Sequence, residues 1–204
     1  MNHAMFIRLN YPEDYQSLKW RLAFFESMTL PTLLRQTVKD FDIWVYCNLK
    51  HADRIRSMSD RLKVYHASRT EDPILPKYNI QTRHDSDDFL RPDYVAKTQS
   101  LCRLHKKETP LVVSFQPYKL DVWTGNKYRH DRYNDQNTSA FQSLYIPDTA
   151  KMYRHVLSFN HRKIWQTYPD VVTVPLGYVT IGIHGMEQST AIQANNKTVG
   201  GKVL

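Results

Sequence analysis

Short apolar segments of strand length alternate with helix-like segments through the first half of the chain, and this pattern limits the folds open to it. The strand-like segments are residues 4–9, 41–47 and 62–66, with helix-like segments at 15–25 and 52–59 between them. Residues 41–47 are nearly continuous in apolar and aromatic side chains, which is typical of a strand buried on both faces of a parallel sheet. Strands that alternate with helices predict a Rossmann-like α/β fold, with a mainly parallel sheet flanked by helices.

The first helix shows a clear periodicity. Apolar residues recur at spacings of three and four, as expected for an amphipathic helix. They are Tyr15, Leu18, Leu22 and Phe25. The sequence Thr-Leu-Pro at 29–31 is expected to interrupt this helix, and the proline is well placed in the first turn of another short helix.

The second half of the chain adds further strand-like segments. They are residues 80–84, 111–115, 141–146, 171–174 and 178–183. Residues 118–123 and 128–133 flank a Thr-Gly-Asn-Lys turn, so they predict a β-hairpin. We expect one domain over residues 1–187, followed by a loose polar tail over residues 188–204.

Two helices are expected between these strands. One follows Pro92, and we expect one row of its side chains to face the protein core. This inward-facing row consists of Tyr94, Thr98, Leu101 and Leu104. The other helix would be capped by Asp148 and run through Met152 and Val156, since aspartate is a favoured N-cap residue.

The composition restricts the partner and the compartment. A net charge of +8 favours an anionic partner. The chain carries no zinc-finger, leucine-zipper or RNA-recognition pattern, so the sequence gives little support for nucleic acid as that partner. No apolar run approaches the roughly 18 residues of a membrane span, and the N-terminus lacks a signal-peptide pattern. Cys47 and Cys102 have no metal-type spacing and are expected as buried thiols. We expect a cytoplasmic protein, with peripheral association at a membrane surface left open.

An acidic cluster, Asp-Ser-Asp-Asp at residues 85–88, follows the strand-like segment 80–84. Like charges in such a cluster are relieved by a hard divalent cation, by hydrogen bonds or by solvent. Ordinary loop and helix-cap roles explain the same residues without a metal. In open α/β sheets, however, ligands collect where strands end, and Arg8, Asn10 and His184 also follow or end predicted strands. This convergence favours a binding site.

Several motifs of the chain resemble those of rhamnosyltransferase-like glycosyltransferases. The motifs are Thr-Arg-His-Asp-Ser-Asp-Asp-Phe-Leu-Arg-Pro-Asp-Tyr-Val at 82–95, Thr-Leu-Pro-Thr-Leu with Gln-Thr at 29–37, Asn-His-Arg at 160–162 and Ile-His-Gly at 183–185. The resemblance spans about residues 6–185. It implies a GT-A fold, in which a Rossmann-like sheet binds a nucleotide-diphosphate sugar and a small β-hairpin region faces the acceptor.

The resemblance also implies a metal site. Asp85 and Asp87 would form the Asp-x-Asp site for Mn²⁺ or Mg²⁺, with His184 as a further ligand. Carboxylate and phosphate oxygens suit such a hard cation, and an imidazole suits Mn²⁺ better than Mg²⁺. Asp88 would orient the site or the donor sugar.

Three further residues are expected on the donor. Arg83 is placed to pair with the aspartates or the diphosphate. Arg8 and Asn10 are candidates for contacting the nucleotide. A structural ion pair explains Arg83 about as well.

The general base and the acceptor groove are assigned less directly. An inverting transferase needs a base for the acceptor hydroxyl, commonly a carboxylate. Asp148 lies roughly where such a base falls in related enzymes, although a helix cap explains it too, and Glu187 is the second candidate. His161 either contacts phosphate or packs against a helix. The aromatic residues of the hairpin suit either a sugar-binding face or core packing.

Together these features predict a metal-dependent glycosyltransferase that acts on a saccharide or another hydroxyl acceptor, as in polysaccharide biosynthesis. The alternatives are another metal-dependent phosphoryl or nucleotidyl transferase and a non-catalytic nucleotide-sugar or carbohydrate-binding module. The chain is short for a GT-A enzyme, which implies an acceptor region that is either reduced or built from a partner. The sequence leaves the donor sugar, its base and the oligomeric state open.

Overall fold

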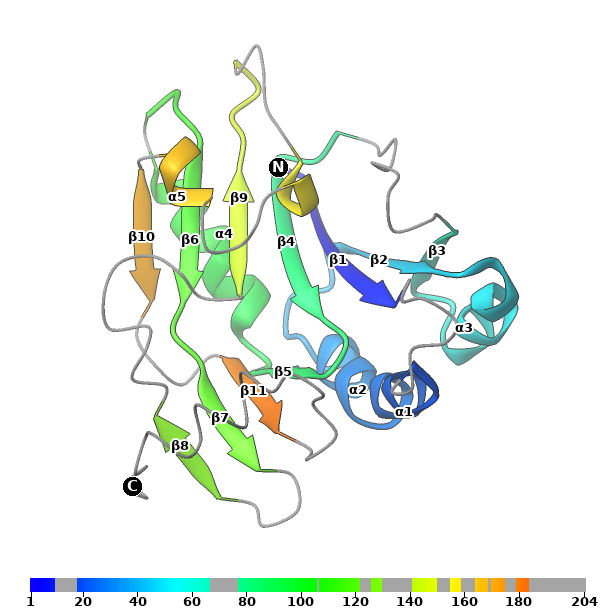
Figure 1. Cartoon of the computed structure of the whole chain (residues 1–204). Helices are drawn as coiled ribbons and strands as arrows, with labels where there is room; N and C mark the ends of the chain where they lie inside the picture. Colours follow the sequence, from blue (N-terminus) through cyan, green and yellow to red (C-terminus); the bar gives the residue numbers. More distant parts are fainter. Residues whose placement is uncertain are drawn as a thin grey trace.

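A seven-stranded sheet forms the centre of this computed structural model, with strand order β10-β6-β9-β4-β1-β2-β3 (Figure 1). The structure describes residues 1–9, 18–66, 77–105, 107–121, 126–129, 141–149, 155–158, 164–168, 170–174 and 179–183. The strands of this sheet are β1 (His3–Leu9), β2 (Asp42–Cys47), β3 (Leu62–His66), β4 (Ile80–Asp85), β6 (Leu111–Phe115), β9 (Gln142–Tyr145) and β10 (Val171–Val174). All neighbours run parallel, except that β9 is antiparallel to both β4 and β6. The mainly parallel sheet expected from the sequence is confirmed.

The parallel register brings the ends of three strands to one edge. Arg8 of β1 lies opposite Tyr46 of β2 on one side and opposite Asp85 of β4 on the other. Because parallel strands share a direction, the carboxyl ends of β1, β2 and β4 meet at this edge. We call it the carboxyl edge.

A second, four-stranded sheet adjoins the first, with the order β5-β11-β7-β8. Its strands are β5 (Asp88–Leu90), β11 (Val179–Ile183), β7 (Tyr118–Asp121) and β8 (Lys127–Arg129). Strands β7 and β8 pair antiparallel, which confirms the predicted hairpin. Only two residues separate the end of β4 from the start of β5, so the acidic cluster joins the two sheets (Figure 1).

The first helical region is continuous where the sequence predicted an interruption. Helix α1 (Leu18–Phe24) passes through a π-helical stretch (Phe25–Thr29) into α2 (Leu30–Leu34). Thr29 and Leu30 keep helical backbone angles, and the wider π-helical stretch directly precedes Pro31, whose ring and missing amide N–H do not fit a regular α-helix interior. The interruption is therefore a local widening of one long helix, and we refer to residues 18–34 as the N-terminal helix.

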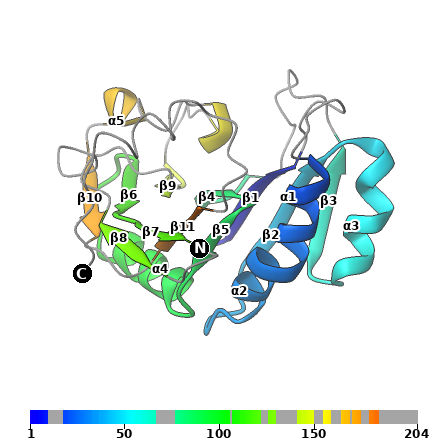
Figure 2. The ribbon, with the colours of Figure 1, turned by 60° about the horizontal axis from the view of Figure 1, so that its bottom comes forward.

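Helices cover both faces of the large sheet. The other helices are α3 (Ala52–Met58), α4 (Tyr94–Leu104) and α5 (Ile164–Thr167), with 3₁₀ turns at Leu49–His51 and Val156–Ser158. Alternate residues of β1 enter two cores: Met5 and Ile7 pack with the N-terminal helix, α3 and α4, whereas Phe6 packs with the Val156–Ser158 turn and α5. Figure 2 shows α1, α2 and α3 against one side of β1, β2 and β3.

One expectation for the helices needs correction, and another lies largely outside the described residues. The buried face of α4 consists of Tyr94, Val95, Thr98, Gln99 and Cys102, whereas Leu104 is 68% exposed. At 100° per residue, Leu104 lies on the other side of the helix from the centre of this face. The helix expected after Asp148 falls largely outside the described residues.

Other expectations hold. Cys47 and Cys102 are buried free thiols. Within the described ranges, no helix has the length and apolar character needed to cross a membrane.

Candidate active site

The acidic cluster forms a tight turn at the carboxyl edge. Asp85 is the last residue of β4, Ser86 and Asp87 make the turn, and Asp88 begins β5. The turn lies beside the carboxyl ends of β1 and β2, where open α/β sheets bind their ligands. The placement of the aspartates at a strand end, expected from the sequence, is confirmed. We call residues 85–88 the aspartate turn.

Asp85 is the accessible carboxylate of the turn, with 30% of its side chain exposed. Two arginines lie on the same face of the sheet, because alternate residues of a strand share a face. Arg83 approaches Asp85 with its guanidinium 3.7 Å from the carboxylate oxygen. Arg8 lies directly opposite Asp85 in the neighbouring strand and donates a 2.8 Å hydrogen bond to the Leu157 carbonyl. The structure therefore brings together three of the predicted donor residues.

Asp87 and Asp88 are more enclosed. Asp87 forms a 2.8 Å ion pair with Arg21 of α1, and only 13% of the Asp87 side chain is exposed. Asp88 is 3% exposed and pairs with Ile181 of β11. The three carboxylates thus have different surroundings, although they are nearly adjacent in the chain.

Two buried polar side chains in and before the turn lack well-formed hydrogen bonds to other described residues. They are the Ser86 hydroxyl and the His84 imidazole. Burial lowers the pKa of His84 to about 4, while the charges of Asp85 and Asp87 and the backbone of Asp88 act in the opposite direction. His84 is therefore neutral at pH 7. Sequence reasoning missed His84 as a neighbour of the site, although it directly precedes Asp85.

The N-terminal helix holds the aspartate turn through its threonines. The Thr29 hydroxyl donates a buried 2.8 Å hydrogen bond to the carbonyl of Ser86. The Thr32 hydroxyl accepts a 3.3 Å hydrogen bond from the amide of Leu90 in β5. One turn of the N-terminal helix therefore contacts both the aspartate turn, at Ser86, and the strand β5 that follows it, at Leu90.

Gln36 extends the same contact toward α4. Its side-chain amide donates a 2.8 Å hydrogen bond to the carbonyl of Arg91, and its side-chain oxygen accepts a 3.0 Å bond from the amide of Val95. The amide of Thr37 donates to the carbonyl of Pro92. The early helix motif at 29–37 therefore positions the segment that carries the aspartates.

The predicted metal ligands are only partly described. Among the described residues, no three His, Cys, Asp or Glu side chains form a group that could hold a metal ion. His184, Asn10 and Glu187 lie outside the described residues, as does His161. Strand β11 ends at Ile183, two residues beyond the pair between Ile181 and Asp88, so the strand before His184 ends on the side of the aspartate turn.

Asp148, the first candidate for the base, lies at the opposite edge of the sheet. Its carboxylate accepts a 2.8 Å hydrogen bond from the side chain of Asn79, which directly precedes β4. Because Asp85 ends the six-residue strand β4, the two carboxylates are about 20 Å apart at 3.3 Å per residue. The structure does not bring Asp148 to the aspartate turn.

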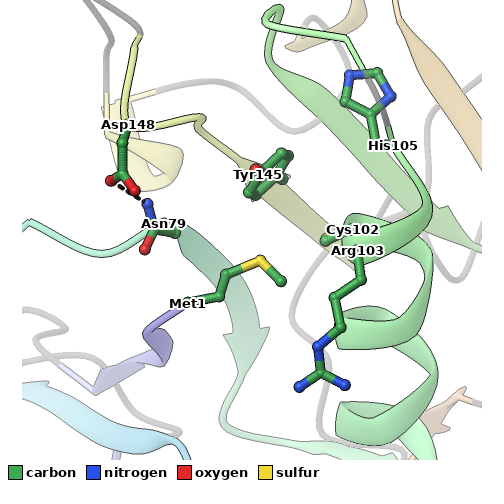
Figure 3. A pocket seen from close by; sticks show the side chains of 7 residues that line it. All are labelled: Met1, Asn79, Cys102, Arg103, His105, Tyr145 and Asp148. Atoms are coloured by element: carbon green, nitrogen blue, oxygen red, sulfur yellow. Dashed lines mark hydrogen bonds between the residues drawn. The ribbon is translucent and has the colours of Figure 1, made fainter.

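Asp148 instead lines a separate pocket of ≈ 290 Å³, shown in Figure 3. The other lining residues are Met1, Asn79, Cys102, Arg103, His105 and Tyr145. The pocket lies where β4 begins and β9 ends, so it belongs to the amino end of β4.

The hairpin that was expected to face the acceptor is described in part. Strands β7 and β8 belong to the sheet that contains β5, so the hairpin and the aspartate turn share one sheet. Tyr118 is half-buried in β7. Trp123 and Tyr133 lie outside the described residues.

Comparison with known proteins places this chain among glycosyltransferase families. Residues 7–71 and 57–196 match the model of a family described as "Putative rhamnosyl transferase". No curated protein matched the sequence.

Solved structures share the fold at low sequence identity. Staphylococcus aureus TarS 1-349 in complex with UDP-GlcNAc has a TM-score of 0.59 and 12% identity, over 92% of this chain and 60% of TarS 1-349. The 4-diphosphocytidyl-2C-methyl-D-erythritol synthase of Anaerococcus prevotii has a TM-score of 0.51 and 14% identity, over 95% of this chain and 94% of its own. These likenesses confirm the GT-A-like fold. The chain spans 60% of the length of TarS 1-349.

Proposed function

The chain belongs to the putative rhamnosyl transferase family, and on that premise we propose that it is a metal-dependent glycosyltransferase with a nucleotide-diphosphate sugar as donor. The observation that carries the proposal is the placement of an accessible carboxylate, Asp85, beside two arginines at the carboxyl edge. The UDP-GlcNAc complex of TarS supports a nucleotide-sugar donor for this fold. The acceptor would be a saccharide or another hydroxyl compound.

The residues of the aspartate turn fit a hard divalent cation. Carboxylate oxygens are the ligands that Mn²⁺ and Mg²⁺ prefer, and the buried Ser86 hydroxyl adds an oxygen without a partner among the described residues. Asp85 would hold the cation directly, with Asp87 beside it and His184 as a further ligand. When bound, the cation neutralises charge that develops on the departing nucleoside diphosphate.

The side chains around the turn have separate roles in this proposal. Arg8 and Arg83 bind the diphosphate, since guanidinium groups match phosphate oxygens in geometry and charge. Asn10 contacts the nucleotide, and Asp88 orients the turn from within β5. Glu187 is the proposed base, because Asp148 lies about 20 Å away at the other edge of the sheet.

The net charge of +8 supports an anionic surface as the place where the acceptor is presented. We propose a cytoplasmic protein that associates peripherally with such a surface.

A thermal-shift panel of nucleoside diphosphates and nucleotide sugars, with and without Mn²⁺, tests the proposal. We expect one nucleotide to raise the melting temperature only when Mn²⁺ is present, because a ligand that binds the native state stabilises it by mass action. Asp85→Asn should abolish this shift and keep the melting temperature of the free protein. Asp53→Asn, a change at an exposed carboxylate on α3, is the matched control and should keep the shift. A shift that needs no metal, or that survives Asp85→Asn, would contradict the proposal.

A further inference from the structure

The ion pair between Arg21 and Asp87 is the most enclosed ion pair of the described residues. Its nitrogen and oxygen atoms are 2.8 Å apart, and the two side chains are 12% and 13% exposed. By contrast, the pair between Arg54 and Glu26 is 47% and 51% exposed. Charges that are shielded from water interact more strongly, so Arg21 acts on the aspartate turn with little screening.

Among the described residues, the charges at the aspartate turn are close to balance. Arg21 pairs with Asp87 and Arg83 approaches Asp85, while Asp88 adds a third carboxylate and Arg8, opposite Asp85 in the next strand, a third guanidinium. A divalent cation on its own therefore meets little net negative charge there. A diphosphate brings negative charge of its own and gains from the same arginines.

We propose that Arg21 is a positioning residue that couples cation binding to diphosphate binding. This inference rests on the proposed function of the same site. Arg21 occupies the Asp87 carboxylate and cancels its charge, so the site binds the cation weakly until a diphosphate arrives. The donor and the metal then bind as a pair, and metal alone does not fill the site.

Three arginine variants separate this role from simple support of the fold. Arg21→Met removes the charge and keeps an apolar side chain, Arg21→Lys keeps the charge, and Arg54→Gln removes a surface charge from α3 as the control. The probes are MnCl₂ alone, followed by Mn²⁺ with inorganic pyrophosphate, which carries a diphosphate without a base or sugar. Isothermal titration calorimetry and Mn²⁺ electron paramagnetic resonance measure both affinities.

The affinity for Mn²⁺ alone and the gain in that affinity from pyrophosphate should change in opposite directions, so the Mn²⁺ affinity measured with pyrophosphate should stay close to the wild-type value. In Arg21→Met we expect Mn²⁺ alone to bind about tenfold more tightly, because the site gains one net negative charge. The gain in Mn²⁺ affinity from pyrophosphate should fall by about tenfold, because the diphosphate loses a cationic neighbour. Arg21→Lys should behave like the wild type to within about threefold, and Arg54→Gln should match it.

Loss of the ion pair will also lower the melting temperature of Arg21→Met, because Asp87 is left enclosed and unpaired. The double variant Arg21→Met/Asp87→Asn removes both charges and keeps the measurement possible. Since its net charge equals that of the wild type, its affinity for Mn²⁺ alone should return to within about threefold of the wild-type value.

Two results would overturn the inference. One is an unchanged Mn²⁺ affinity in a folded Arg21→Met protein, and the other is an equal weakening with both probes, which is what a purely structural role produces. Wild-type protein that binds no Mn²⁺ even with pyrophosphate would instead refute the proposed function, and the inference would fall with it.

Discussion

At the scale of single residues, the position of a carboxylate on the sheet decides its role more than its type does. Asp85 ends β4 and Asp148 comes three residues after β9, but β9 is antiparallel to β4, so the segment after β9 lies near the beginning of β4. We predict that Asp148→Asn keeps the affinity for Mn²⁺ with pyrophosphate to within about twofold, since the charge change is about 20 Å from Asp85 and screened beyond about 8 Å at physiological salt. Calorimetry on Asp148→Asn, with Asp85→Asn measured in parallel, checks this.

A loss of affinity in Asp148→Asn similar to that in Asp85→Asn would show that the two edges of the sheet act together. The side-chain amide of Asn79 keeps an acceptor in this variant, because asparagine also presents an oxygen. A change in stability is therefore expected to be small.

Sequence reasoning found the aspartate turn but not its partners. A strand followed by aspartates is visible in the chain itself, because strand length and apolar pattern are local properties. The pair between Arg21 and Asp87 joins residues far apart in sequence, and nothing in a helix pattern marks Arg21 as facing the site. The direction of β9 is a property of the whole sheet, which is why Asp148 was expected beside the site.

At the scale of elements, the N-terminal helix acts as a support for the aspartate turn. Gln36 is fully buried, and it satisfies the carbonyl of Arg91 and the amide of Val95. We predict that Gln36→Leu lowers the free energy of unfolding by about 2–4 kcal/mol, because the buried amide of Val95 and the partly buried carbonyl of Arg91 lose their partners. Urea unfolding followed by circular dichroism measures this change.

The matched control is Arg35→Gln, one residue earlier on an exposed position. Its side chain makes an exposed hydrogen bond to the carbonyl of Pro31, so we expect a change within about 0.5 kcal/mol. If the two variants unfold at the same urea concentration, Gln36 does not hold the turn.

The elements themselves were largely predictable, and the exceptions have physical causes. Strands such as β1 and β2 carry continuous apolar residues, so their bounds were expected to within one or two residues. Strand β5 has only three residues and begins with a buried aspartate, so no local pattern distinguishes it from a loop. The π-helical stretch before Pro31 contacts the aspartate turn through the Thr29 hydroxyl, and a contact between residues so far apart in the chain leaves no local pattern.

At the scale of the whole molecule, a buried histidine belongs to a hydrogen-bond network that links strands of the large sheet to a helix. His3 of β1 is 2% exposed, and its Nε2 lies 2.8 Å from the hydroxyl of Thr82 in β4. The Thr82 hydroxyl is 2.6 Å from that of Ser143 in β9, which is 3.3 Å from the hydroxyl of Tyr94 in α4. Three strands and a helix therefore share one buried network.

The burial of His3 makes the stability of the molecule depend on pH. Burial lowers the pKa of His3 from 6.5 to about 3, so between these values the unfolded chain binds a proton that the native state does not. The free energy of unfolding therefore falls as the pH drops below 6.5, by about 2 kcal/mol from His3 alone between pH 7 and pH 5. Urea unfolding at the two pH values measures the total, and His3→Gln, which keeps a hydrogen-bonding side chain that does not titrate, isolates the share of His3. That variant should lose about 2 kcal/mol less than the wild type over the same interval, and an equal loss in both proteins would show that His3 does not set the acid sensitivity.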